Sequence, residues 1–163
     1  MMEARIENPA MTFPGALEAL TKLPASVGDA GIPDTTRYLI EVRAGQINGC
    51  AVCLDMHTRE LQHAGEPNAK ILTVGAWREA PYFTDAERAA LALTEAATRL
   101  ADRPDPVPDE VWEEAARHYT EPQLAALVIS IATINAWNRL QAVTRQISGD
   151  WVEQVIQTNH QAA

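Results

Sequence analysis

Residues 124–147 constrain the fold more than any other part of the sequence. Their apolar side chains fall on most of the circumference of a helix, and the preceding residues 120–123, Thr-Glu-Pro-Gln, have the form of a capping sequence at a helix start. A helix that is apolar almost all round must be covered by other elements or by another subunit. The sequence therefore predicts a helix that is central to the fold or forms part of a subunit interface.

Helical signals recur along the rest of the chain, and no segment shows the apolar–polar alternation of a strand. The clearest signal is Thr84-x-x-Glu87, a capping box that precedes a run rich in alanine and leucine. Residues 102–108 contain three prolines and are expected to form a loop, because too little chain follows them for a second domain. We predict an all-α, single-domain fold over residues 1–163, with an irregular start at 1–14 and further helices at 15–23, 34–48, 50–65, 67–77, 84–101, 109–119 and 150–159.

Charge and hydropathy limit the partners of the chain. The formal net charge is −9 and Lys and Arg do not cluster, which argues against nucleic-acid binding. The first residues lack the pattern of a signal peptide, and no apolar run reaches the ~20 residues of a membrane span. We therefore expect a cytoplasmic protein with no membrane contact, and in that compartment a Cys-x-x-Cys pair is normally reduced.

The chemistry of the chain is expected at Cys50, Cys53 and His57. These are the only two cysteines in the sequence, and with helical spacing the two thiols and the imidazole share one face. A thiol with a pKa near 8.5 is only ~3% thiolate at pH 7, whereas a pKa of ~6 makes it about 90% thiolate. A helix N-terminus is too weak to supply that change alone, so His57 is the candidate base. The pattern favours a thiol redox enzyme, in which a second thiol captures the sulfenic acid formed on the first.

Two plainer interpretations of the cysteines remain open. A structural zinc site needs a fourth ligand, but His63 lies on another side of the helix from His57, and the sequence has no second Cys-x-x-Cys. Buried cysteines can also be inert packing residues. We expect no metal and no cofactor, and we expect His63 and His118 to be surface residues.

Four blocks of sequence resemble a known family. They are Arg-Ala-Gly-Gln-Ile-Asn-Gly-Cys-Ala-Val-Cys-Leu-Asp-Met-His-Thr at 43–58, Trp-Arg-Glu at 77–79, Glu-Arg-Ala-Ala-Leu at 87–91 and Asn-Ala-Trp-Asn-Arg-Leu at 135–140. The first resembles the core signature of the alkylhydroperoxidase D-like proteins, within the carboxymuconolactone decarboxylase superfamily. The resemblance covers about residues 35–145, with the core signature at about 35–100.

The resemblance implies a fold, an activity and partners. It implies a helical protein that forms a homotrimer or homohexamer and reduces hydroperoxides through the Cys-x-x-Cys pair. By similarity, Cys53 is the peroxidatic thiol and Cys50 the resolving one. A dihydrolipoyl group or another disulfide-exchange reductant would return the electrons.

The chain departs from the family pattern at two positions. Tyr38 stands where the family usually has a glutamate of the proton relay, and Gly45 replaces a common serine. We predict that Glu41, with Glu60 as second choice, assists His57, and that Tyr38 contributes at most a neutral hydroxyl. A solvated surface carboxylate is the alternative for either glutamate. The polar residues of the last block, Asn135, Asn138 and Arg139, are expected to form a structural network or a subunit contact.

These observations predict a CxxC-dependent peroxidase or thiol-disulfide oxidoreductase. A decarboxylase or other lyase of the wider superfamily is an alternative, although those relatives generally lack the Cys-x-x-Cys pair. A redox-responsive binding or scaffold protein that oxidises once, without turnover, is an alternative of another class. Residues 77–79 are expected to close a helix and pack locally.

Overall fold

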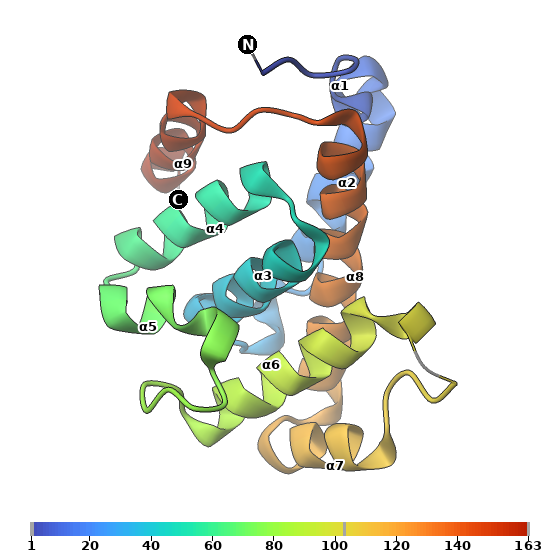
Figure 1. The fold of residues 1–163 in the computed structure, drawn as a ribbon, viewed down its shortest axis with the longest axis vertical. Helices are drawn as coiled ribbons and strands as arrows, with labels where there is room; N and C mark the ends of the chain where they lie inside the picture. The colour runs from blue at the N-terminus through green and yellow to red at the C-terminus, as the bar shows by residue number, and fades with distance from the viewer. Residues whose placement is uncertain (1, 103, 163) are drawn as a thin grey trace.

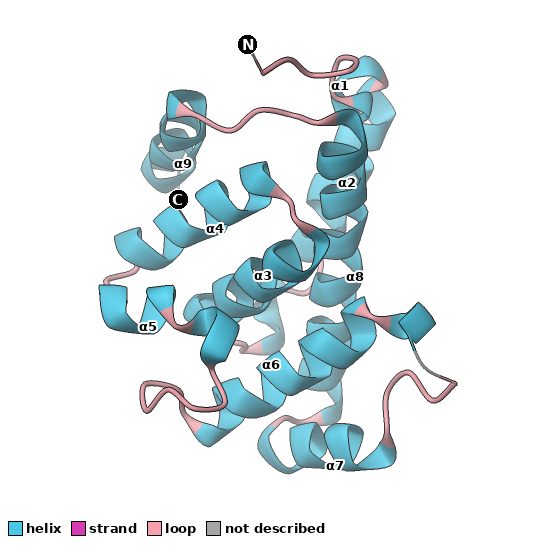
Figure 2. Cartoon of the chain, viewed as in Figure 1, coloured by secondary structure: helices cyan, strands magenta, loops and turns pink. Residues whose placement is uncertain are grey.

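The computed structural model describes residues 2–102 and 104–162, and these residues form helices joined by short loops (Figures 1 and 2). The described residues contain no strand, so the predicted all-α fold is confirmed. Three short 3₁₀ turns, η1 (Gly28–Ala30), η2 (Val74–Ala76) and η3 (Leu100–Asp102), lie between α-helices. The α-helices are α1 (Pro9–Thr12), α2 (Pro14–Ala25), α3 (Asp34–Asn48), α4 (Ala51–His63), α5 (Asn68–Leu72), α6 (Asp85–Thr98), α7 (Asp109–His118), α8 (Glu121–Thr144) and α9 (Asp150–Ala162).

Helix α3 lies in the middle of the arrangement, where it packs against α4, α6 and α8 (Figure 1). The long helix α8 contacts α2, α3, α4, α6 and α7, so its predicted central position is confirmed. These helices do not cover α8 completely, because the side chains of Val128 and Val143 are 41% and 64% exposed. Helix α9 returns to pack on α4. Within the described residues, no helix is both long enough and apolar enough to cross a bilayer.

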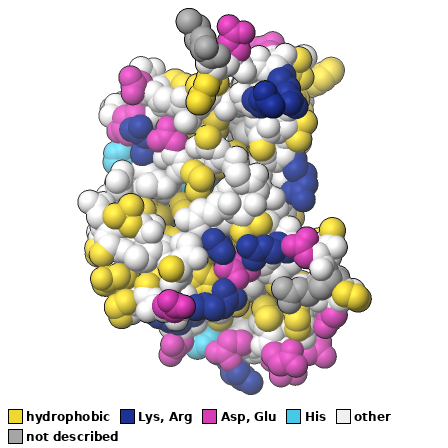
Figure 3. Space-filling model, in the orientation of Figure 1, with side chains coloured by type: hydrophobic (Ala, Val, Ile, Leu, Met, Phe, Trp, Pro, Cys, Tyr) yellow, Lys and Arg dark blue, Asp and Glu magenta, His cyan; other side chains and the backbone are white. Residues whose placement is uncertain are grey.

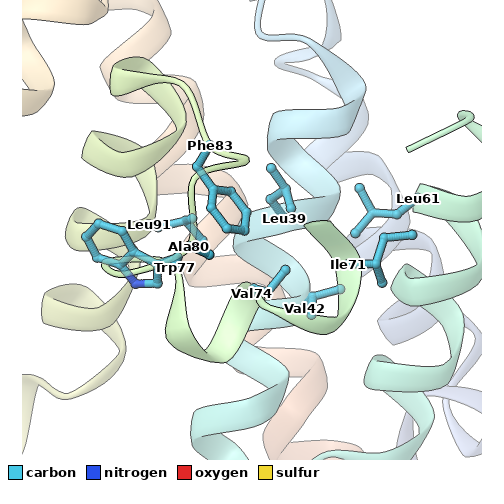
Figure 4. Close-up of a cluster of buried hydrophobic side chains, with 9 residues drawn as sticks. All are labelled: Leu39, Val42, Leu61, Ile71, Val74, Trp77, Ala80, Phe83 and Leu91. Carbon is cyan, nitrogen blue, oxygen red and sulfur yellow. The ribbon is translucent and has the colours of Figure 1, made fainter. Parts of the chain in front are cut away.

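Most buried apolar side chains of the described residues belong to three clusters, and α3 contributes to each of them. Leu39 and Val42 belong to the first, where they lie between side chains of α4 and α5 on one side and of α6 and the preceding loop on the other (Figure 4). Ile40 belongs to a second cluster with residues of α6, α7 and α8. Ala44 belongs to the third, which contains both cysteines. Burying a leucine, valine or isoleucine side chain stabilises the fold by roughly 1.5–3 kcal/mol, so Leu39, Ile40 and Val42 anchor α3 on several sides.

Some predicted helix boundaries are wrong. The helix expected over residues 67–77 is divided into α5 and η2 at Thr73, whose Oγ1 donates to the carbonyl oxygen of Ala69 at 2.7 Å. Threonine and the following Gly75 are both poor helix formers, which explains the break. Helix α2 continues through Pro24, because a proline in a last turn removes a single hydrogen bond. The expected irregular start contains α1, whose first turn is capped by Asn8.

The capping box at the start of α6 supports a first prediction. The Thr84 hydroxyl accepts from the Glu87 backbone N–H at 3.2 Å, and the Glu87 carboxylate accepts from the Thr84 N–H at 2.9 Å. Thr84→Ala is therefore expected to lower the free energy of unfolding by about 1 kcal/mol, measured by urea titration. Thr21→Ala makes the same change on the exposed surface of α2 and should stay within about 0.5 kcal/mol. Equal losses in the two variants would contradict the role of the cap.

Candidate active site

The turn between α3 and α4 places the first cysteine. Gly49 ends α3 with a φ of 68°, a left-handed conformation that glycine adopts without strain. The Cys50 N–H then donates to the Gly45 carbonyl oxygen at 3.0 Å. Helix α4 begins one residue after the predicted start, so Cys50 is its N-cap and the Cys50 Sγ accepts from the Cys53 N–H at 3.3 Å. The first sulfur is thus held at the positive end of the helix dipole.

The two sulfurs are joined as a disulfide, with the Cα atoms 5.4 Å apart. The expectation of two free thiols is therefore not met in this structure, which holds the oxidised form of the pair. Cys50 and Cys53 are 1% and 4% exposed, and both pack with Ile134 and the partly buried Trp137 of α8. Little of either cysteine is therefore accessible to solvent.

Two carboxylates hold the imidazole of His57. Its Nδ1 lies 2.6 Å from an oxygen of Glu60 and 3.1 Å from an oxygen of Glu41, and all three side chains are largely buried. From the sequence, Glu41 was the first choice and Glu60 the second choice for the carboxylate that assists His57. The structure places both beside the same nitrogen, with Glu60 closer. Neither is the solvated surface carboxylate of the alternative interpretation. Among described residues the Nε2 atom of His57 has no partner.

This arrangement changes the acidity of the groups. Burial lowers the pKa of His57, but the charge of Glu41 and the hydrogen bond to Glu60 outweigh burial, so the pKa of His57 lies above its usual value. Burial raises the pKa of Glu41, and the charges of His57 and Arg37 offset it only in part. The cluster therefore retains a proton at neutral pH more readily than an isolated histidine does.

Tyr38 lies beside this cluster without joining it. Its partly buried ring packs against the first core cluster, and the Arg37 guanidinium lies 5.1 Å from the ring centre. Its hydroxyl donates to no described residue. Burial, followed by the nearby charge of Glu60, raises the pKa of Tyr38, so the phenol is neutral at pH 7. Tyr38 cannot replace the family glutamate as an anion.

The same three groups are the place where the described residues could hold a cation. One ligand atom each from Glu41, His57 and Glu60 lies within 4.8 Å of the others. Three such donors suit a divalent ion that completes its shell with water. In the alternative of a zinc site at the cysteines and His57, His63 was the candidate fourth ligand; in this structure the sulfurs are bonded to each other, and His63 Nε2 lies 3.3 Å from Glu153 of α9.

Asparagines of α3 and α8 form a network behind the cysteine turn. The Asn48 amide donates to the side-chain oxygens of Asn135, at 3.0 Å, and Asn138, at 2.8 Å. Asn135 in turn donates to Thr98 of α6 at 3.1 Å, and Arg139 donates to Asn135. The predicted structural network at these α8 residues is therefore present within one chain. The place of Asn48 in this network was not predicted, because its only signal in the sequence is the Asn-Gly pair that ends α3.

A second network, centred on Glu95, was also missed. The Glu95 carboxylate accepts from Trp77 Nε1 at 3.0 Å, from Arg78 at 2.7 Å and from Arg43 at 2.8 Å. Trp77 and Arg78 were expected to pack locally, but they bind α6 instead, which corrects that prediction. Burial raises the pKa of Glu95, yet the bonds from Trp77 and the arginines outweigh burial and hold the pKa below its usual value. The network fixes the middle of α3, and so the approach to Cys50.

Comparisons with known proteins agree with this fold. The model of the carboxymuconolactone decarboxylase family matches residues 14–96. The uncharacterized protein YdfG of Bacillus subtilis is 37% identical over 127 residues, which cover 78% of this chain and 85% of YdfG.

Solved structures share the arrangement of helices. A protein of unknown function from Agrobacterium tumefaciens, described as a candidate antioxidant defence protein AhpD, is 34% identical, with a TM-score of 0.83 over 90% of this chain and 99% of its own. The debrominase Bmp8, in complex with 2,3,4-tribromopyrrole, is 19% identical, with a TM-score of 0.75 over 91% of this chain and 78% of its own, a likeness of fold alone.

Proposed function

The chain belongs to the carboxymuconolactone decarboxylase family and has an AhpD-like fold, and from this we propose that it is a CxxC-dependent peroxidase. The observation that carries the proposal is the Cys50–Cys53 disulfide one helical turn before His57, whose imidazole is held by two carboxylates. A pair that closes into a disulfide supplies two electrons, and a basic imidazole supplies the proton transfer that peroxide cleavage needs.

In the proposed cycle the Cys53 thiolate attacks one oxygen of a hydroperoxide. The O–O bond breaks, the leaving alkoxide takes a proton to become an alcohol, and Cys53 becomes a sulfenic acid. The Cys50 thiolate then attacks the Cys53 sulfur, the hydroxyl leaves as water with one further proton, and the disulfide forms. A dithiol reductant returns two electrons and two protons and restores both thiols.

His57 serves as the base of this cycle. With its Nδ1–H donated to Glu60, and Glu41 close to the same nitrogen, the nitrogen left for proton exchange is Nε2. The two carboxylates stabilise the imidazolium that forms when His57 takes the thiol proton. We further propose that the protein works in the cytoplasm as a homotrimer or homohexamer, with a disulfide-exchange partner as its reductant.

The roles of the carboxylates can be tested through thiol reactivity. In the reduced protein, Glu41→Gln and Glu60→Gln should each weaken His57 as a base, so the rate-versus-pH curve for Cys53 alkylation should move to higher pH. The rate at pH 7 should fall about threefold or more, as expected when a neighbouring charge is removed. Tyr38→Phe is the matched control and should leave the curve in place. Unchanged curves in both glutamine variants would remove the carboxylates from the mechanism.

A redox sensor without turnover is the second candidate, favoured by the burial of both sulfurs. Consumption of hydrogen peroxide and cumene hydroperoxide, with dithiothreitol as reductant, separates the two. A peroxidase consumes many equivalents of peroxide per chain, whereas a sensor consumes one. Protein alkylated after reduction is the control. Consumption that stops after one equivalent, although dithiothreitol re-reduces the disulfide, would contradict the peroxidase.

A further inference from the structure

A cavity of about 1030 Å³, open to solvent on one side, lies apart from the Glu41–His57–Glu60 cluster. Its walls come from the end of α3, the C-terminal half of α6 with η3, helix α7 and helix α8. Most of the lining side chains are apolar, among them Leu93, Leu100, Val107, Trp112, Val128 and Ile131. Small-molecule sites are concave and mostly apolar, and they span roughly 300–1000 Å³, so this cavity has the size and character of one.

A guanidinium with no acidic partner lies in the wall of this cavity. Arg139 donates through one terminal nitrogen to the backbone oxygen of Asn135, at 2.9 Å, and to its side-chain oxygen, at 3.1 Å. Both acceptors are neutral, and no carboxylate of the described residues pairs with Arg139. The other terminal nitrogen and Nε are therefore available, in the fork that binds a carboxylate through two parallel hydrogen bonds.

A second arginine, Arg99, lines the same cavity. Arg99 follows Thr98, which Asn135 binds, and its nearest carboxylate oxygen, on Glu95, is 3.9 Å away. That carboxylate already accepts from two arginines and a tryptophan. Among the described residues of the wall Asp102 is the acidic one, so the two arginines and the aspartate described there sum to a charge of +1. The chain as a whole carries −9, and basic side chains gather across the middle of the face in Figure 3.

We propose that this cavity binds a small carboxylic acid with an extended apolar body. The apolar body lies against the aliphatic and aromatic walls, and the carboxylate pairs with Arg139, with Arg99 adding a second positive charge. The single negative charge of a carboxylate balances the local charge of +1, whereas the two negative charges of a phosphate dianion would leave a net negative charge in the cavity. The proposal does not depend on the peroxidase activity, because no cysteine lines the cavity.

Isothermal titration of the intact protein with decanoate, below the concentration at which it forms micelles, tests the proposal. Decanoate should bind at least about tenfold more tightly than decanol, because a charge-assisted bidentate contact is lost in the alcohol. Arg139→Gln should weaken decanoate binding about tenfold and leave decanol binding unchanged. Arg139→Lys should give an intermediate loss, because lysine keeps the charge without the fork.

Two further variants complete the design. Arg117→Gln removes the same charge from α7 outside the cavity, where Arg117 pairs with Glu114, and should not alter binding. Ala132→Trp fills an exposed position of the cavity wall and should block decanoate and decanol alike. Equal affinities for decanoate and decanol, or a decanoate affinity that survives Arg139→Gln, would overturn the proposal. If decanoate does not bind, and if sedimentation shows an oligomer that Ala132→Trp dissociates, the proposal is overturned and the cavity wall is a subunit interface.

Discussion

Cys53→Ser is expected to abolish peroxide consumption, whereas Cys50→Ser is expected to leave a sulfenic acid on Cys53 that dimedone traps. The reason is chemical: the peroxidatic thiol is needed for the first step, while the resolving thiol is needed only to close the disulfide. Mass spectrometry of the dimedone adduct locates the oxidised residue, and peroxide consumption with dithiothreitol measures turnover. In Cys50→Ser, any remaining turnover requires dithiothreitol to attack the Cys53 sulfenic acid directly in place of Cys50.

The structure contains a specific reason why the assignment could be reversed. Cys50 is the N-cap of α4, and its sulfur accepts the Cys53 N–H, an arrangement that stabilises a thiolate on Cys50. Against this, His57 lies one helical turn from Cys53, where it can take the proton of that thiol. A dimedone adduct on Cys50 in the Cys53→Ser protein, with Cys50→Ser inert, would exchange the two roles.

Glu95→Gln is expected to lower the free energy of unfolding by about 3–5 kcal/mol, the usual loss when one partner of a buried ion pair is removed. The side chain is 9% exposed and holds Trp77, Arg43 and Arg78 together. A glutamine keeps one acceptor oxygen and leaves the Arg43 guanidinium without a charged partner. For a chain of this size the loss corresponds to a fall of about 10 °C in the melting temperature, measured by calorimetry.

Glu114→Gln is the matched control, because Glu114 pairs with Arg117 and His118 on the surface of α7 and should matter little. The pH dependence gives a second test. The pKa of Glu95 is lower in the folded than in the unfolded protein, so its stabilisation is full above the unfolded pKa and is lost as the pH falls through the folded one. The difference between wild type and Glu95→Gln should therefore shrink in acid. A difference that stays constant from pH 7 to acid would contradict the ionic role of Glu95.

Local signals in the sequence were enough to predict much of the fold. The capping box at Thr84 and the apolar run of α8 are properties of adjacent residues, and the structure has both helices. The predicted boundary between the helices at 34–48 and 50–65 likewise agrees with the turn that the structure has before Cys50. The break at Thr73 was missed, because the apolar pattern of residues 67–77 continues through it, whereas the Thr73 hydroxyl donates to the carbonyl oxygen of Ala69 one turn earlier.

The candidate site was predicted in part, because some of its residues are neighbours along one helix and others are not. Spacing along α4 connected Cys53, His57 and Glu60, which lie one turn apart. Glu41 was predicted as well, from its place on the helix that leads to the cysteines, but its distance from His57 depends on how α3 packs against α4, which the sequence does not specify. The contacts of Glu95 join segments that are far apart in the sequence. They form only when the helices pack together, so no local pattern predicted them.

The position of Cys50 as the N-cap of α4 links the chemistry of the sulfur to the dynamics of the backbone. The Cys53 amide proton is directed at Sγ of Cys50 in the disulfide. A thiolate is a stronger acceptor than a disulfide sulfur, so reduction should tighten this contact and slow the exchange of that single amide with solvent. By thermodynamic linkage, a first turn of α4 that is better ordered in the reduced protein makes the pair easier to reduce. The exchange rate of one backbone proton thus reports the oxidation state of the pair.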